Sequence, residues 1–158
     1  MNIRSPDKSY STNRLLLGTH TSGEAQNYIQ IAHVLLPNPT VPGANDYDED
    51  REEIGGYGAP AGSAGNDVKF DIVQRIDHPG EVNKARYMPQ NPDMIATMCV
   101  DGKTMIWDRA KHSSHPTGTV NAQIELVGHS EEGFGLDWNP HQEGLLVTGS
   151  RDTTVKLW

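Results

Sequence analysis

The sequence has little cysteine, few aromatic residues and no long apolar run. Cys99 is the one cysteine among 158 residues, which excludes an internal disulfide and a cysteine-rich metal cluster and fits a reducing compartment. Aromatic residues make up 6%, and scattered glycines and prolines divide the apolar residues into short pieces, which excludes a long helical bundle. No apolar run approaches the roughly 18 residues that cross a bilayer, so we expect a soluble protein, neither secreted nor membrane-spanning.

Basic charge is also scarce. The chain has 13 Lys and Arg against 21 Asp and Glu, a net charge of −8. Binding of nucleic acid needs a basic surface that releases counterions, so we expect no direct nucleic-acid partner. An acidic surface would instead attract a basic protein or peptide, although acidity also serves solubility alone.

Strand signals dominate the first half of the chain. Short runs with β-branched or aromatic members, bounded by Gly, Pro, Asn and Asp, predict strands over residues 15–21, 28–36 and 68–76. Residues 37–67 contain four prolines, several glycines and an acidic run, a composition that predicts a mobile surface insertion. Residues 1–14 are expected to be a flexible amino-terminal segment.

The second half of the chain repeats itself with a shift of 51 residues. The coinciding pairs are His78 with His129, Pro89 with Pro140, Thr97 with Thr148, Asp101 with Asp152, and Trp107 with Trp158. Equal spacings without a gap indicate repeated supersecondary units. Each copy holds three strand signals, and a fourth precedes each copy, at residues 68–76 and 123–127. Four antiparallel strands per unit is typical of a propeller blade.

The second copy resembles a nearly complete WD repeat, in Gly128-His129, residues 136–140 and residues 145–158, and the first copy ends in a looser version of the same signature. In such repeats an imidazole, a hydroxyl, a carboxylate and an indole form one buried hydrogen-bonded chain. The resemblance implies this role for His78, Thr97, Asp101 and Trp107 in the first copy and for His129, Thr148 or Ser150, Asp152 and Trp158 in the second. Both hydroxyl candidates of the second copy lie on one face of their strand, so the sequence leaves both open.

This resemblance implies an all-β fold, a partial WD-repeat β-propeller of about two and a half blades of four-stranded antiparallel sheet. We expect a partial first blade over residues 15–77, carrying the insertion and lacking its opening strand. One WD repeat is expected over residues 78–127, and a second, truncated repeat over residues 128–158.

A narrower resemblance covers nearly the whole chain from about residue 8. Residues 16–22, 77–92 and 128–135 are similar to the histone-binding WD-repeat family, which contains the retinoblastoma-binding chaperones and the accessory subunit of type B histone acetyltransferase. Residues 46–58 and 96–109 resemble the fungal acetyltransferase subunits most. A full member has seven blades, an amino-terminal helix and a late acidic loop that together grip a histone helix. We therefore expect this chain to be a fragment without that site.

The family resemblance implies a second histone surface on the top rim of the propeller. The matching residues are Glu81, Asn83, Glu132 and Phe134. The repeat supports the match, because each glutamate comes three residues after its histidine, and Asn83 and Phe134 each come five residues after it. A carboxylate suits Arg or Lys, and an amide or ring beside it suits a backbone or an alkyl stem. Phe134 replaces a tyrosine common in the family, and the plainer alternative is that rim glutamates are merely solvated.

The function that follows is a non-catalytic histone-binding adaptor of a type B histone acetyltransferase or of other chromatin-modifying and chromatin-assembly complexes. The partners implied are core histones three and four and the catalytic acetyltransferase subunit or other chromatin-complex subunits, in nucleus and cytoplasm. A generic WD scaffold, in ubiquitin ligation or RNA processing, stays open as an alternative. A hydrolase built on a propeller is a further rival, with His129 and Asp152 as its catalytic pair, although no suitable nucleophile accompanies them.

Other motifs are weak. Residues 112–115 hold two histidines without a nearby cysteine or carboxylate pair. An apparent calcium loop beginning at Asp46 has Arg51 where glycine is needed. Residues 56–61 match a dinucleotide fingerprint by letters only, since a proline interrupts them. We expect no metal, no cofactor and no catalytic residue.

Overall fold

The computed structural model describes residues 2–4, 10–37, 47–48, 53–54 and 69–158. It divides into two compact units, one formed by residues 1–15 and 32–71 and the other by residues 16–31 and 72–158. Most of the predicted insertion lies outside the described residues. The described part contains no helix long and apolar enough to cross a membrane.

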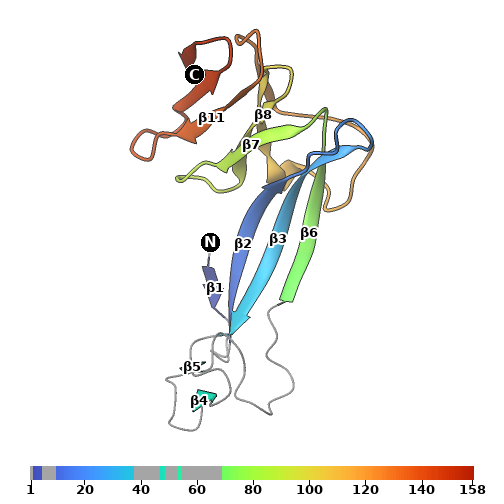
Figure 1. The fold of residues 1–158 in the computed structure, drawn as a ribbon, viewed down its shortest axis with the longest axis vertical. Helices are drawn as coiled ribbons and strands as arrows, with labels where there is room; N and C mark the ends of the chain where they lie inside the picture. The colour runs from blue at the N-terminus through green and yellow to red at the C-terminus, as the bar shows by residue number, and fades with distance from the viewer. Residues whose placement is uncertain (1, 5–9, 38–46, 49–52, 55–68) are drawn as a thin grey trace. The chain divides into compact units, whose positions relative to one another are not determined.

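The first sheet has four strands in the order β1-β2-β3-β6, of which β2, β3 and β6 run side by side in Figure 1. Its strands are β1 (Asn2–Arg4), β2 (Tyr10–Gly18), β3 (Asn27–Pro37) and β6 (Lys69–His78). Three strands were predicted; the fourth, β1, pairs Asn2–Arg4 with residues 11–13, within the segment expected to be flexible. Within the insertion, β4 (Tyr47–Asp48) pairs with β5 (Glu53–Ile54).

The second and third sheets contain the two repeats. The second sheet has the order β10-β9-β8-β7 and the third the order β11-β12-β13, and both are antiparallel. Their strands are β7 (Val82–Tyr87), β8 (Met94–Cys99), β9 (Thr104–Asp108), β10 (Ile124–Leu126), β11 (Gly133–Trp138), β12 (Leu146–Ser150) and β13 (Val155–Leu157). A short 3-10 helix, η2 (Arg109–Lys111), follows β9. The predicted all-β class is confirmed, as is the four-stranded antiparallel unit of the first repeat.

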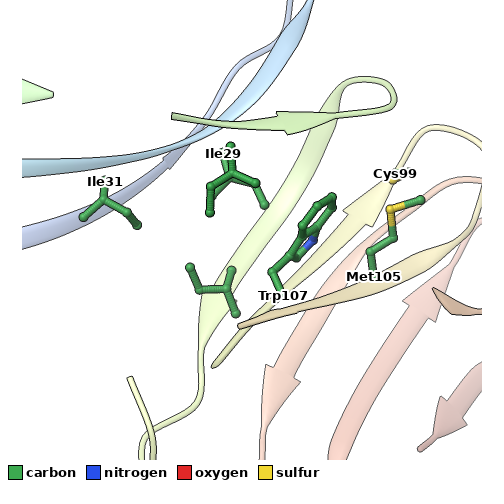
Figure 2. Close-up of a cluster of buried hydrophobic side chains, with 7 residues drawn as sticks. Ile29, Ile31, Cys99, Met105 and Trp107 are labelled. Atoms are coloured by element: carbon green, nitrogen blue, oxygen red, sulfur yellow. The ribbon is translucent and has the colours of Figure 1, made fainter. Parts of the chain in front are cut away.

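Strand β8 is buried on both faces and joins two apolar clusters. Ile95 and Cys99 point into one cluster, with Ile29 and Trp107, and Figure 2 shows the Trp107 indole among these side chains. The alternate β8 residues, including Met98, point into the other cluster. The members of this second cluster are Met88, Ala96, Met98, Ile106, Leu136, Trp138 and Leu146. The period of two along one strand therefore packs the second sheet on both sides.

Candidate functional site

A buried chain of hydrogen bonds crosses the third sheet. Trp158 donates its indole N–H to Thr148 Oγ1 at 2.8 Å, and Thr148 Oγ1 lies 2.8 Å from His129 Nε2. His129 Nδ1 lies 2.8 Å from Asp152 Oδ2. Thr148 is fully buried and His129 nearly so. These hydrogen bonds thus join strand β12, the end of β13 and the loop that leads into β11.

The Asp152 carboxylate, which can only accept, fixes which group donates in each hydrogen bond of this series. Ionised Asp152 has no proton to give, so in the neutral imidazole Nδ1 of His129 carries the proton and Nε2 accepts. The Thr148 hydroxyl then accepts from Trp158 and donates to His129. Both functions of the hydroxyl are used, and neither ring nitrogen of the histidine is left unpaired.

Asp152 also organises the turn between β12 and β13. Its Oδ1 accepts from the Thr154 hydroxyl at 2.7 Å and from the Thr154 N–H at 2.9 Å, and its Oδ2 accepts from the Ser130 N–H at 3.1 Å. The hydroxyl of Thr154 contributes most to holding the pKa of Asp152 far below its ordinary value, and the His129 ring adds to the effect. One carboxylate therefore ties the β12–β13 turn to the loop entering β11.

The second sheet contains a shorter version of the same chain. Trp107 donates its indole N–H to Thr97 Oγ1 at 2.9 Å, and Thr97 Oγ1 lies 2.9 Å from His78 Nε2. The expectation for Asp101 was wrong, because His78 Nδ1 donates to the Gly80 carbonyl at 2.7 Å instead. Asp101 is exposed, and its carboxylate accepts from the Lys103 N–H at 3.0 Å. Burial lowers the pKa of His78, as expected for an imidazole whose partners are neutral.

Ser150 does not belong to the buried chain. Its hydroxyl donates to the carbonyls of Glu131 and Glu132, at 2.6 and 3.0 Å, and accepts from the Asp152 N–H at 3.1 Å. Thr148 therefore fills the position for which the sequence left two candidates. Ser150 instead fastens the backbone next to Glu132, one of the predicted rim residues.

Two β-bulges present the next pair of predicted rim residues. In the β7–β8 pair, Val82 faces Cys99 and Lys84 faces Met98, so Asn83 is the extra residue. Phe134 is the extra residue at the start of β11 in the same way, between Gly133 and Gly135. A bulge turns its side chain away from the ladder, and Phe134 is 56% exposed. The repeat thus places Asn83 and Phe134 at equivalent bulges, five residues after the histidines that anchor the loops.

Glu132 is the centre of a polar cluster on this rim. Arg151 donates to its Oε1 at 2.8 Å, and the Asn83 amide donates to its Oε2 at 3.2 Å. The same amide also donates to the Gly133 carbonyl at 3.3 Å. Arg151 first, and Asn83 second, hold the pKa of Glu132 below its ordinary value. The structure therefore brings together two of the four predicted residues, from adjacent sheets.

Glu81 has a different partner. Its Oε2 lies 3.0 Å from Nε2 of His20, in the loop between β2 and β3. Sequence reasoning missed both His20 and Arg151. The repeat held a signal for Arg151, because the shift of 51 residues aligns it with Val100, an apolar residue. No comparable signal pointed to His20, which comes from a segment outside the repeats.

Two family models match this chain. One describes the histone-binding protein RBBP4 or a CAF1 complex component and matches residues 2–38; the other describes the WD domain, G-beta repeat, and matches residues 120–158, which contain the whole third sheet. The chain is similar to the histone-binding WD-repeat family. Its sheets are accordingly blades of a partial WD-repeat propeller, as predicted.

Relatives from fungi extend the similarity over nearly the whole of this chain. A histone acetyltransferase type B subunit 2 from Aspergillus oryzae is 69% identical over 97% of this chain and 35% of its own. Proteins of the same name from Gibberella zeae and Mycosarcoma maydis are 62% and 47% identical, over 99% and 97% of this chain and 36% and 38% of theirs. The chain thus spans little more than a third of the length of these relatives.

The rim offers two carboxylates, an amide and an exposed ring. The Glu132 carboxylate contacts a guanidinium and the Glu81 carboxylate an imidazole, so both carboxylates face nitrogen donors. Neither contact is deeply buried: the side chains of His20 and Arg151 are 60% and 67% exposed. Within the described ranges no group of three or more His, Cys, Asp or Glu residues is arranged to hold a metal ion.

Proposed function

We propose that this protein is a non-catalytic histone-binding subunit of a type B histone acetyltransferase or a related chromatin complex. The observation that carries the proposal is the rim, where the Asn83 and Glu132 side chains meet across two sheets and Phe134 is exposed on a bulge two residues after Glu132. The names of the fungal relatives and the description of the amino-terminal family model support it.

The rim suits an unmodified basic tail. A Lys or Arg side chain of the tail would reach the carboxylates of Glu81 and Glu132, where charge-assisted hydrogen bonds are strongest. The Asn83 amide offers a donor for a tail carbonyl, and the Phe134 ring offers an apolar surface for an alkyl stem. The partners we propose are core histones three and four, bound through their tails, and the catalytic acetyltransferase subunit or other chromatin-complex subunits. Nucleus and cytoplasm are the proposed locations.

The test is binding of a fluorescently labelled histone tail peptide, followed by anisotropy at low and physiological salt. Replacing Glu81→Gln together with Glu132→Gln keeps the side-chain shape and removes both charges. We expect affinity to fall by about tenfold or more at low salt, and by less at higher salt because ions screen exposed charges. The melting temperature should stay close to that of the wild type.

A matched variant separates local from general electrostatics. Asp137→Asn with Glu143→Gln also removes two negative charges, from the end of β11 far from the rim and from the exposed β11–β12 loop. It should leave peptide affinity nearly unchanged. Undiminished affinity in the rim variant, or an equal loss in the control, would favour the generic WD scaffold instead.

A further inference from the structure

The contact between Arg151 and Glu132 is built by the backbone as well as by the side chains. The Arg151 N–H donates to the Glu132 carbonyl at 2.9 Å. The Ser150 hydroxyl donates to the same carbonyl at 3.0 Å. These bonds hold the β12–β13 turn directly against the rim, so the guanidinium starts within reach of the carboxylate. The side chains then meet at 2.8 Å.

Both oxygens of the Glu132 carboxylate are engaged, Oε1 by Arg151 and Oε2 by Asn83. A cation arriving from outside meets a carboxylate whose charge is already balanced by a guanidinium of the same protein. The first repeat has no equivalent arginine in its own turn, because Val100 occupies the position that Arg151 has in the second repeat. The two rim glutamates are therefore unequal despite their equivalent positions.

We propose that Arg151 is an internal competitor that occupies the cation site at Glu132 and leaves it when a basic tail binds. This inference rests on the proposed function and concerns the regulation of the same site. The Arg151 side chain is 67% exposed, so it can move into solvent without unfolding the turn that its backbone anchors. Only the open fraction of molecules binds a tail cation, and the apparent affinity is reduced by that fraction.

The size of the effect follows from the exposure of the pair. Ion pairs on wet surfaces favour their closed state by a factor of about two to five. The open fraction is then about one third to one sixth, so Arg151→Gln should bind the labelled tail peptide about three to six times more tightly than the wild type at low salt. The gain should shrink as salt rises, because screening weakens the internal pair as well.

Lys111→Gln is the matched control. It also removes one positive charge and one exposed ion pair, that with Asp108 at 3.3 Å. Lys111 lies in η2, which follows β9, and residues 100–103 form the turn at the other end of β9. The five residues of β9 span more than the Debye length, which is about 8 Å at physiological salt. The effect of Lys111→Gln on affinity should be small at physiological salt, where the two variants are compared. Equal tightening by Lys111→Gln and Arg151→Gln would overturn the proposal, as would weaker binding by Arg151→Gln.

Two further measurements identify the mechanism. In a Glu132→Gln background, Arg151→Gln should no longer change affinity for the peptide, because Arg151 then has no carboxylate with which to pair. A tail peptide in which glutamine replaces every lysine and arginine should likewise show no gain from Arg151→Gln. A gain that persists in either case refutes competition for the carboxylate.

Failure of this inference differs from failure of the proposed function. If Glu81→Gln with Glu132→Gln abolishes binding but Arg151→Gln equals the wild type, the tail site stands and the competitor is rejected. If the wild-type protein does not bind the tail peptide at all, the proposed function is rejected and the competitor with it. Melting temperatures of all variants, measured in parallel, exclude loss of fold as the cause.

Discussion

Replacing Thr148 by valine tests the buried chain of the third sheet. The two side chains have nearly the same shape, so packing is preserved while the hydroxyl is lost. That hydroxyl accepts from the Trp158 indole at 2.8 Å and lies 2.8 Å from His129 Nε2. Thr148→Val therefore leaves one donor and one acceptor without a partner.

The magnitude follows from the burial of the groups left behind. An unsatisfied buried polar group costs about 1 to 3 kcal/mol. His129 is almost fully buried, whereas Trp158 is only partly so and water can reach its edge. The sum for both groups is roughly 2 to 4 kcal/mol of unfolding free energy. Thr148→Ser keeps the hydroxyl and removes one buried methyl, so it should cost only about 1 kcal/mol.

The assay is urea denaturation followed by tryptophan fluorescence, with Thr119→Val as an exposed threonine control in the β9–β10 loop. The expected order of stability is wild type and Thr119→Val first, then Thr148→Ser, then Thr148→Val. If Thr148→Val were as stable as Thr148→Ser, the hydroxyl would contribute nothing and the chain would be a geometric coincidence.

Two other features lead to direct measurements. The pKa of Asp152 is depressed in the folded protein, chiefly by the Thr154 hydroxyl, so its carboxylate stabilises the fold fully above the ordinary value of 3.8 and less as pH falls through the folded value. The stability difference between wild type and Asp152→Asn should be larger at pH 7 than at pH 3, and an equal difference at both would contradict the linkage. Burial raises the pKa of Cys99 to about 12, so iodoacetamide at pH 8 should alkylate this thiol only after unfolding; labelling of the native protein at the unfolded rate would argue against the buried position.

The repeat spacing predicted the architecture of the second and third sheets well, because every strand of a repeat is followed by its own turn residues. It could not choose between Thr148 and Ser150, since both share a face of β12. The choice depends on where the strand ends: Ser150 sits at the turn, next to the carbonyls of Glu131 and Glu132, and bonds to them instead. Such a preference follows from backbone placement, which residue types do not reveal.

The same limit explains the error at Asp101. The sequence shows a carboxylate at the right spacing in both repeats, but His78 takes the Gly80 carbonyl two residues away as its acceptor. Every residue has a carbonyl, so no pattern of side chains marks this rival. His20 was missed for a related reason: its contact with Glu81 joins loops that are distant in sequence. Sequence periodicity predicts contacts within a repeat and not those made by a neighbouring segment.

The two bulges have a consequence for engineering. Residues 83 and 134 have no counterpart across the ladder, since the pairing passes from Val82 to Lys84 and from Gly133 to Gly135. Changing either side chain therefore leaves the strand register and its main-chain hydrogen bonds as they are. Each repeat supplies one such replaceable position on the same rim. A library varied at these two positions would change the surface of the rim while the strand pairing beneath it stays the same.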